Sequence, residues 1–144
     1  MKAYFDTSFI VPLFLPEPQS ERIEAHIRGL PESTKLTISQ WTMVELASVF
    51  SRLVRMRELE RPLAKTILRT ATSVISESFD IITPVGRDYE RCRNFLGGFD
   101  NALRAGDALH LAIAANHESD IIFSLDKGML SAGAALGLNL SDGG

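Results

Sequence analysis

Short apolar segments alternate with longer segments of helical periodicity along nearly the whole chain, and this alternation constrains the fold more than any other feature. The apolar segments are Lys2–Phe5, Leu36–Ile38, Ile81–Ile82, Ile121–Phe123 and Leu138–Leu140. Segments this short and this apolar favour β-strands that are covered on both faces. Strands that alternate with helices need crossover connections, which produce a mostly parallel sheet. We therefore predict an α/β fold, a three-layer α/β/α sandwich with a mostly parallel sheet of four to five strands.

Local signals mark the helix boundaries between these strands. Ser39 is a suitable N-cap, and Leu46 and Phe50 belong to the apolar residues that then recur at helical spacing. Pro62 falls in a first turn, where proline is tolerated. The predicted helices cover residues 16–31, 40–54, 61–78, 86–96, 105–117 and 127–136. The fifth of these is apolar on nearly all sides, which indicates a buried helix.

The chain has 144 residues, enough for a substantial core, and we assign residues 1–144 to a single domain. The one cysteine, Cys92, can form no internal disulfide, so we expect a reducing, cytoplasmic compartment. Asp6 and Pro12 interrupt the apolar start of the chain, which argues against a signal peptide. No apolar run is long enough to span a bilayer, so we expect no membrane partner.

Four carboxylates fall at or near the ends of the predicted strands. Asp6 directly follows the first strand, and Asp126 follows the fourth. Glu45 lies early in the helix after the second strand, and Asp107 lies in the first turn of the buried helix that leads into the fourth strand. In a parallel sheet the site lies at the carboxyl ends of the strands. We therefore expect these four side chains to converge.

A cluster of four carboxylates is chemically meaningful if it holds a cation. Without one, the charges repel each other and are costly to bury. Mg²⁺ and Mn²⁺ are hard ions that prefer carboxylate oxygens and retained water. Such an ion can polarise a phosphodiester and orient a water nucleophile. The pattern therefore predicts a Mg²⁺ site, with Mn²⁺ as an alternative ion.

Each acidic residue also has a purely structural interpretation. Asp6 and Asp126 could each cap the helix that follows. Glu45 could be a surface residue favoured by the helix dipole, and Asp107 could be a first-turn residue favoured in the same way. His110, one turn after Asp107, is interpreted as a packed or hydrogen-bonded core histidine. The chain shows no Ser–His–Asp arrangement, P-loop or dinucleotide fingerprint. The shared placement of all four carboxylates is what favours a functional site.

Four segments of the chain carry a resemblance to a known family: YFDTS, ISQWTMVELASVF, LRAGDALHLAIAA and IIFSLDKGM. In their order and spacing the chain resembles PIN-domain ribonucleases, and in particular the small single-domain VapC toxins of prokaryotic toxin–antitoxin pairs. The resemblance covers nearly the whole chain. It implies a parallel sheet between helices, metal-dependent cleavage of RNA, a cognate antitoxin and a homodimer.

Position by position, the resemblance assigns the acidic site. It makes Asp6 and Asp107 the principal Mg²⁺ ligands, and Glu45 and Asp126 would complete the catalytic set through water or a second ion. Thr7 and Ser124 match supporting polar positions whose hydroxyls could hydrogen-bond a carboxylate or a metal-bound water.

Candidate RNA-binding residues come from the distribution of basic side chains. The net charge of −3 argues against a protein that simply coats nucleic acid, but it leaves room for a nuclease with local basic groups. Arg61, Lys65 and Arg69 follow at four-residue steps and share a helix face that could guide an RNA backbone. A solvated helix face explains any one of them equally well. Arg104 is closer to the predicted acidic site.

Two other functions compete with a ribonuclease. The first is a catalytically silent PIN-like domain that only binds protein, and such a domain has no reason to keep four repelling carboxylates. The second is a phosphatase-like enzyme with Asp6 as nucleophile. That chemistry normally needs a second aspartate two positions later, where this chain has Ser8.

Overall fold

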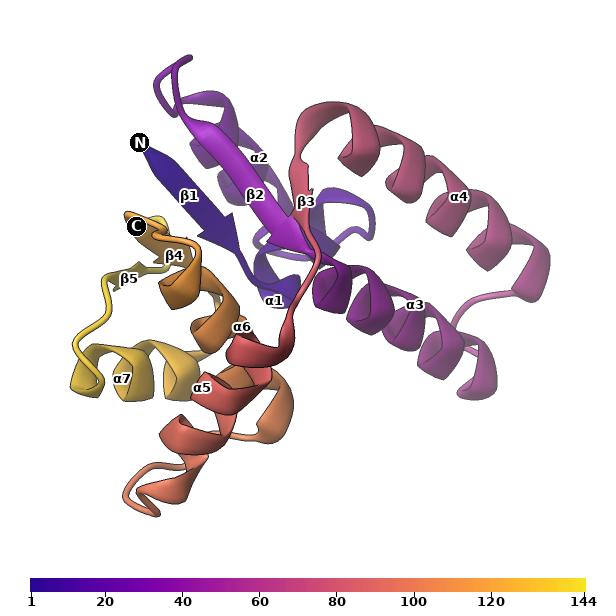
Figure 1. Cartoon of the computed structure of the whole chain (residues 1–144). Helices are drawn as coiled ribbons and strands as arrows, with labels where there is room; N and C mark the ends of the chain where they lie inside the picture. Colours follow the sequence, from indigo (N-terminus) through magenta and orange to yellow (C-terminus); the bar gives the residue numbers. More distant parts are fainter.

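The computed structural model describes residues 1–144 as a five-stranded sheet between two layers of helices (Figure 1). The strands are β1 (Lys2–Phe5), β2 (Lys35–Ser39), β3 (Asp80–Ile82), β4 (Ile121–Phe123) and β5 (Leu140–Ser141). The helices are α1 (Thr7–Ile10), η1 (Val11–Leu13), α2 (Ser20–Arg28), α3 (Gln40–Arg55), α4 (Arg61–Ser78), α5 (Gly86–Gly97), α6 (Ala105–Asn116) and α7 (Lys127–Ala135). No helix is long and apolar enough to cross a membrane.

All strand pairs are parallel, and the strand order is β3-β2-β1-β4-β5. The chain places β2 on one side of β1 and later returns to place β4 on the other side. The strand order therefore reverses at β1, and a crevice at such a point lies outside the carboxyl ends of the strands. Asp6 directly follows β1, so it stands at this crevice.

Successive side chains of each strand point to opposite faces of the sheet and contribute to two separate hydrophobic cores. Ala3 and Phe5 of β1 face a core built with α2, α3 and α4, where Phe50 and Ile75 are buried. Tyr4 faces the opposite core, which is built with α5, α6 and α7. Both faces of the sheet are therefore covered, as the predicted three-layer sandwich requires.

The helix signals in the sequence correspond to observed contacts. The Ser39 hydroxyl accepts a hydrogen bond from the Thr42 backbone amide, so Ser39 is the N-cap of α3. Pro62 occupies the first turn of α4. These two helices carry their apolar residues against the sheet, and α3 in this way presents Glu45 near the carboxyl end of β1.

Most predicted bounds agree with the structure to within one residue, and larger differences occur in three places. Helix α2 spans Ser20–Arg28 and not residues 16–31; it begins late because Pro16 and Pro18 disfavour helical backbone in the residues before them. The short helices α1 and η1 were not predicted. Strand β5 is displaced towards the C-terminus, since Leu140–Ser141 and not Leu138–Leu140 pairs with β4.

Candidate active site

The four predicted carboxylates line one pocket of about 420 Å³. Asp6 comes from the end of β1, Glu45 from α3, Asp107 from α6 and Asp126 from the loop after β4. We call this hollow the acidic pocket. Its remaining lining residues are Thr7, Ser8, Val11, Ser48, Val49, Arg52, Arg104 and His110. Four segments that are distant in sequence therefore converge at the carboxyl edge of the sheet.

Asp6 is buried and held by three donors. Its Oδ1 accepts hydrogen bonds from the Ser8 hydroxyl at 2.6 Å and from the Phe9 amide at 3.3 Å, and its Oδ2 accepts one from the Ser124 hydroxyl at 2.8 Å. Burial raises the pKa of the Asp6 carboxyl, against the lowering influence of His110 and of these three hydrogen bonds. The carboxylate is therefore fixed in orientation while its ionised form is disfavoured.

Glu45 is held through one of its two carboxylate oxygens. The Thr7 hydroxyl donates to Oε1 at 2.6 Å, and Nε2 of the buried His110 lies 2.5 Å from the same oxygen. Burial alone would raise the pKa of Glu45, but the hydrogen bond and attraction of His110, with the Thr7 hydroxyl and Arg104, keep it below its usual value. Glu45 is thus poised as a carboxylate.

Asp107 and Asp126 share a single counter-ion. Arg104 Nε lies 3.6 Å from Asp107 Oδ2, and a terminal nitrogen of the same guanidinium lies 3.6 Å from Asp126 Oδ2. Asp126 also caps α7, because its Oδ1 accepts a hydrogen bond from the Met129 amide at 3.0 Å. Burial, followed by repulsion from Asp126, raises the pKa of Asp107, and Arg104 opposes this shift. The Arg104 side chain is 80% exposed, so its attraction is screened by water.

The donor chemistry of the acidic pocket fits a divalent cation such as Mg²⁺. All four side chains offer carboxylate oxygens, which hard cations prefer. As the side chains lie, no three acidic, histidine or cysteine groups are close enough together to hold an ion. Asp107 and Asp126 are only partly buried, and each is paired at its Oδ2 with the exposed Arg104 guanidinium, which a cation would replace as their counter-ion.

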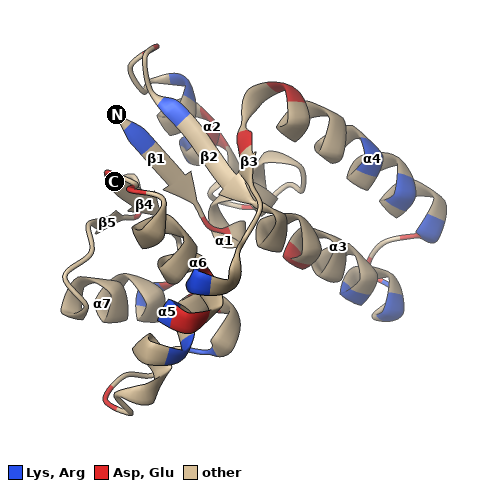
Figure 2. Ribbon diagram, viewed as in Figure 1, with Lys and Arg blue, Asp and Glu red and all other residues tan.

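The predicted RNA-binding residues divide between two surfaces. Arg104 lines the acidic pocket, whereas Arg61 and Lys65 line a different hollow and Arg69 lines neither. Figure 2 shows basic residues spread along α4 and at the C-terminal end of α3. Arg52 also lines the acidic pocket, although it is not among the four candidate RNA-binding residues predicted from the sequence. Its position two helical turns after Glu45 on α3 was the signal that could have identified it.

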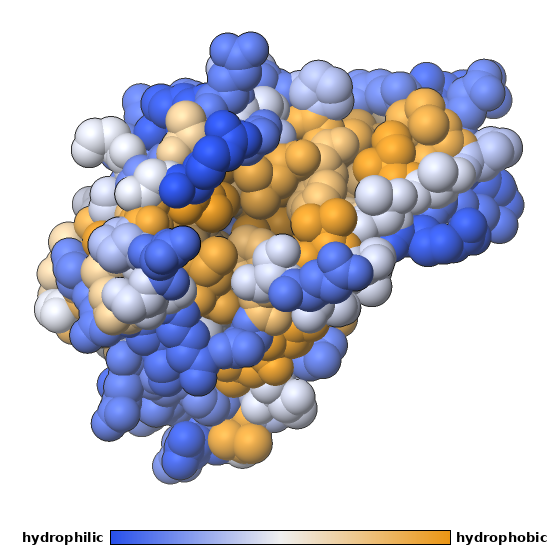
Figure 3. Space-filling view, turned by 90° about the horizontal axis from the view of Figure 1, so that it is seen from above, coloured by the Kyte–Doolittle hydropathy of each residue, from blue (hydrophilic) through white to orange (hydrophobic).

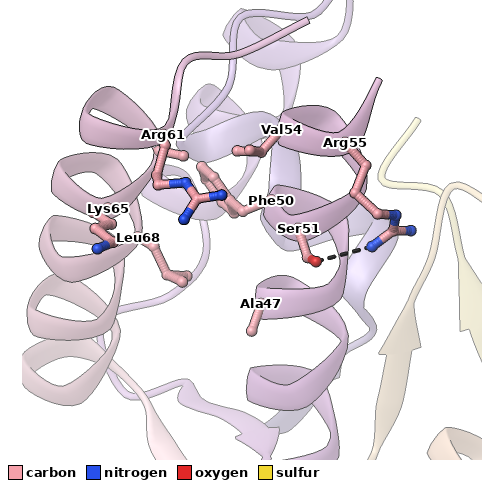
Figure 4. Close-up of a pocket in the computed structure, with 9 residues that line it drawn as sticks. Ala47, Phe50, Ser51, Val54, Arg55, Arg61, Lys65 and Leu68 are labelled. Atoms are coloured by element: carbon pink, nitrogen blue, oxygen red, sulfur yellow. Dashed lines mark hydrogen bonds between the residues drawn. The ribbon is translucent and has the colours of Figure 1, made fainter. Parts of the chain in front are cut away.

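The second hollow lies between α3 and α4 and is mainly apolar (Figure 4). We call it the α3–α4 groove. Phe50 and Val54 line it from α3 and Leu68 from α4, while Arg61 and Lys65 stand on α4 beside them. It shares no lining residue with the acidic pocket.

The raised pKa of Asp107 predicts a pH dependence of the metal-free fold. Above pH 3.8, the unperturbed value, the folded state keeps the Asp107 proton longer than the unfolded state does. The free energy of unfolding therefore falls as pH rises through this window, and Asp107→Asn removes the effect. In chelator, the stability of Asp107→Asn relative to wild type should rise with pH from about 4 and then level off. Denaturant titrations at several pH values measure this difference, and a difference independent of pH would contradict the assignment.

Comparison with known proteins identifies a matching family and solved structures of similar fold. The family model described as PIN domain matches residues 3–134. A search of curated proteins finds no match. Among solved structures, VapBC2 from Rickettsia felis, bound to a DNA fragment from its promoter, has a TM-score of 0.74 at 14% identity over 98% of both chains.

Two further solved structures show the same likeness. FitAcB from Neisseria gonorrhoeae has a TM-score of 0.74 at 20% identity and covers 98% of this chain and 97% of its own. VapC20 from Mycobacterium tuberculosis, described as a sarcin–ricin loop cleaving toxin, has a TM-score of 0.72 at 16% identity over 91% of this chain and 95% of its own. At these identities the likeness shows a common fold.

Proposed function

The chain belongs to the PIN domain family, and from this premise we propose that it is a metal-dependent endoribonuclease, the toxin of a toxin–antitoxin pair. One observation carries the proposal. Four carboxylates from four separate elements line one pocket, and burial and mutual repulsion disfavour the ionised form of Asp107 there. A cation-binding site explains this arrangement, whereas a protein-binding surface gains nothing from it.

In this proposal Asp6 and Asp107 hold Mg²⁺, and Glu45 and Asp126 complete the site. The ion would polarise the scissile phosphate and lower the pKa of the attacking water. The protein itself fixes the ligands: Ser124 holds Asp6 at 2.8 Å, and Thr7 holds Glu45 at 2.6 Å. Hydrolysis forms a bond from a water oxygen to phosphorus while the bond to the leaving ribose oxygen breaks and that oxygen takes a proton.

The two arginines of the acidic pocket supply the phosphate contacts in this proposal. Arg52 and Arg104 both line it, and a guanidinium matches the geometry of phosphate oxygens. Arg104 pairs with Asp107 and Asp126 when no cation neutralises them. Once a cation takes over these carboxylates, the Arg104 guanidinium is free to contact RNA.

The phosphatase-like alternative fits the geometry poorly. A nucleophilic aspartate needs an oxygen that is free to attack phosphorus. Both oxygens of Asp6 accept hydrogen bonds, and Ser8, where a second acid would be needed, donates one of them. The hydrogen bonds and the missing second acid therefore count against Asp6 as a nucleophile.

The direct test is RNA cleavage by the purified protein with and without divalent metal. We expect cleavage in millimolar Mg²⁺ or Mn²⁺, none in excess chelator, and recovery when Mg²⁺ is restored. Sequencing of the new RNA ends then identifies the cleavage sites. Cleavage that persists in chelator, or intact RNA in every condition, would contradict the proposal.

The proposed partners are an antitoxin and a second copy of the chain, in the cytoplasm. The solved structures of similar fold include a toxin–antitoxin complex from Klebsiella pneumoniae.

The surface offers apolar area for a partner: Val44 on α3 and Leu63 on α4 are both more than half exposed. Figure 3 shows apolar side chains gathered in the middle of the face seen from above, with hydrophilic residues around them. We place antitoxin docking at the α3–α4 groove, where basic Arg61 and Lys65 would favour an acidic, amphipathic segment.

A substitution at Gly106 tests how tightly the acidic pocket is packed around Glu45. A Cβ at this position would lie 3.1 Å from Glu45 Oε2 and 3.2 Å from Trp41 Cζ2, so Gly106→Ala must displace Glu45. We expect RNA cleavage to fall by about tenfold, because small misplacements of catalytic groups are costly. The melting temperature is measured as well, because the gain of roughly 0.5–1 kcal/mol from alanine in a helix is opposed by the cost of displacing Glu45 and Trp41.

Gly97→Ala is the matched control for this change. Gly97 also lies in a helix, and a Cβ there meets nothing within 4 Å. Cleavage rates and melting temperatures of the two variants are compared with those of the wild type. Equal cleavage by both variants would show that Gly106 places no constraint on Glu45.

A further inference from the structure

We propose that His110 is a positioning residue that acts through Glu45, as part of a buried hydrogen-bond chain running from Ser39 through Tyr4 to the acidic pocket. The inference rests on the proposed function and deepens it, because it assigns a role to a residue that would not itself touch metal or RNA. It is carried by the contacts of His110, which is 1% exposed and bonded at both ring nitrogens.

The hydrogen-bond chain joins residues from five elements. Ser39 Oγ, at the end of β2, lies 2.9 Å from the Tyr4 hydroxyl of β1. The Tyr4 hydroxyl lies 2.7 Å from Nδ1 of His110 on α6. Nε2 of His110 lies 2.5 Å from Oε1 of Glu45 on α3 and 3.2 Å from the Thr7 hydroxyl. All of these links except the one to Glu45 are buried, so each group depends on its neighbours for hydrogen bonds.

The partner of Nε2 determines that this nitrogen carries a hydrogen. Nε2 faces a carboxylate oxygen, which only accepts, so Nε2 donates its hydrogen to Glu45. On the other side of the ring, Nδ1 is hydrogen-bonded to the Tyr4 hydroxyl, and the Tyr4 and Ser39 hydroxyls share a further hydrogen bond. Because the imidazole is held at both ring nitrogens, its orientation is fixed and its Nε2–H is directed at Glu45.

The hydrogen-bond chain determines which carboxylate oxygen of Glu45 is free in the acidic pocket. His110 and Thr7 both bind Oε1 of Glu45, so they leave Oε2 free. Oε2 lies over Gly106, one residue before Asp107, where a Cβ would be only 3.1 Å away. The hydrogen-bond chain thus holds Glu45 by one oxygen and leaves the other beside the first turn of α6, next to Asp107, in the way that outer hydrogen-bond partners orient metal ligands.

A packed histidine with no role at the pocket is the competing explanation, and a pair of substitutions separates the two. In His110→Gln, the new side-chain amide reaches the position of Nε2 and can still donate to Glu45. In His110→Asn, the shorter amide reaches only the position of Nδ1, so it keeps a partner for Tyr4 and loses the bond to Glu45. Both variants replace the imidazole with an amide, which matches them in polarity.

The experiment measures the Mn²⁺ dissociation constant of the purified protein and its kcat for RNA. We expect His110→Asn to bind Mn²⁺ about tenfold more weakly or worse, and His110→Gln to recover most of this loss. In a Glu45→Ala background, His110→Asn should cause no further loss, because its effect passes through Glu45. The inference would be overturned if His110→Asn weakened Mn²⁺ binding as much in the Glu45→Ala background as in the wild type, or if it did not weaken binding at all.

A measurement on the wild type keeps the inference testable if a variant does not fold. The ¹⁵N chemical shifts of the His110 ring in the metal-free protein report which nitrogen carries hydrogen. A protonated Nε2 supports the inference, and an unprotonated Nε2 overturns it. If the wild type binds Mn²⁺ and cuts RNA, and His110→Asn does both equally well, the inference is refuted but the proposed function is not. Wild type that does neither would refute the proposed function, and the inference with it.

Discussion

Asp107→Asn is expected to lower kcat for RNA cleavage by about a thousandfold or more, because it removes a charged ligand and keeps the shape of the side chain. Asp107 is the clearest position for this test. Its only ion-pair partner is the exposed Arg104, so the amide disturbs little else in the fold. Cleavage is measured in millimolar Mg²⁺ on one RNA substrate for wild type and variant.

Asp100→Asn is the matched control for this variant. Asp100 is exposed, lies a few residues earlier in the chain and lines none of the described pockets. We expect it to cleave RNA at the wild-type rate. Near-normal cleavage by Asp107→Asn in Mg²⁺ would contradict the site assignment.

Asp6→Asn should also abolish cleavage, but it tests the site less cleanly. The two oxygens of Asp6 accept from Ser8, Phe9 and Ser124, and an asparagine NH₂ group cannot accept from any of them. Part of the effect would therefore come from lost stability.

Expression of the wild-type protein alone is expected to arrest bacterial growth, and co-expression of its antitoxin should restore it. The reason is that unregulated cleavage of RNA stops protein synthesis, whereas a bound antitoxin blocks it. Asp107→Asn, expressed to the same soluble level, should allow normal growth, and this variant separates cleavage from the burden of expression. Growth is followed by plating on inducing medium. Harmless expression of folded, soluble wild type would argue strongly against a toxin.

Much of the fold could be predicted from local sequence. The bounds of β1, β4 and α4 follow from short apolar runs and from Pro62, and they are confirmed residue by residue. The strand order could not be derived, because it depends on which crossover passes to which side of β1. Helix α2 was extended too far because its amphipathic pattern hides the effect of the two prolines.

The convergence of the carboxylates was also predictable from local sequence. Asp6 and Asp126 directly follow strands, and parallel strands bring their carboxyl ends to one edge. Both residues also cap the helices that follow them. The capping interpretation and the site interpretation are therefore compatible, since one oxygen of each carboxylate accepts from a helix amide while the other contacts a residue of the site, Ser124 for Asp6 and Arg104 for Asp126.

The hydrogen bonds inside the site could not be predicted from sequence. Glu45 and His110 are 65 residues apart, and no local pattern indicates that they meet. The sequence indicated that His110 is a core histidine, and it is buried, but its partners depend on how α6 packs against β1 and α3. The pairing of Arg104 with two carboxylates likewise depends on the relative placement of α6 and the loop after β4.

Binding of Mn²⁺ to the metal-free protein tests most directly whether the four carboxylates form a cation site. The free ion is followed by its electron paramagnetic resonance signal as protein is added, for wild type and for Asp107→Asn. The account predicts saturable binding by the wild type, competition by Mg²⁺, and binding that is lost or strongly weakened in Asp107→Asn. Absence of saturable binding by folded wild type at millimolar Mn²⁺, or equal binding by Asp107→Asn, would contradict it.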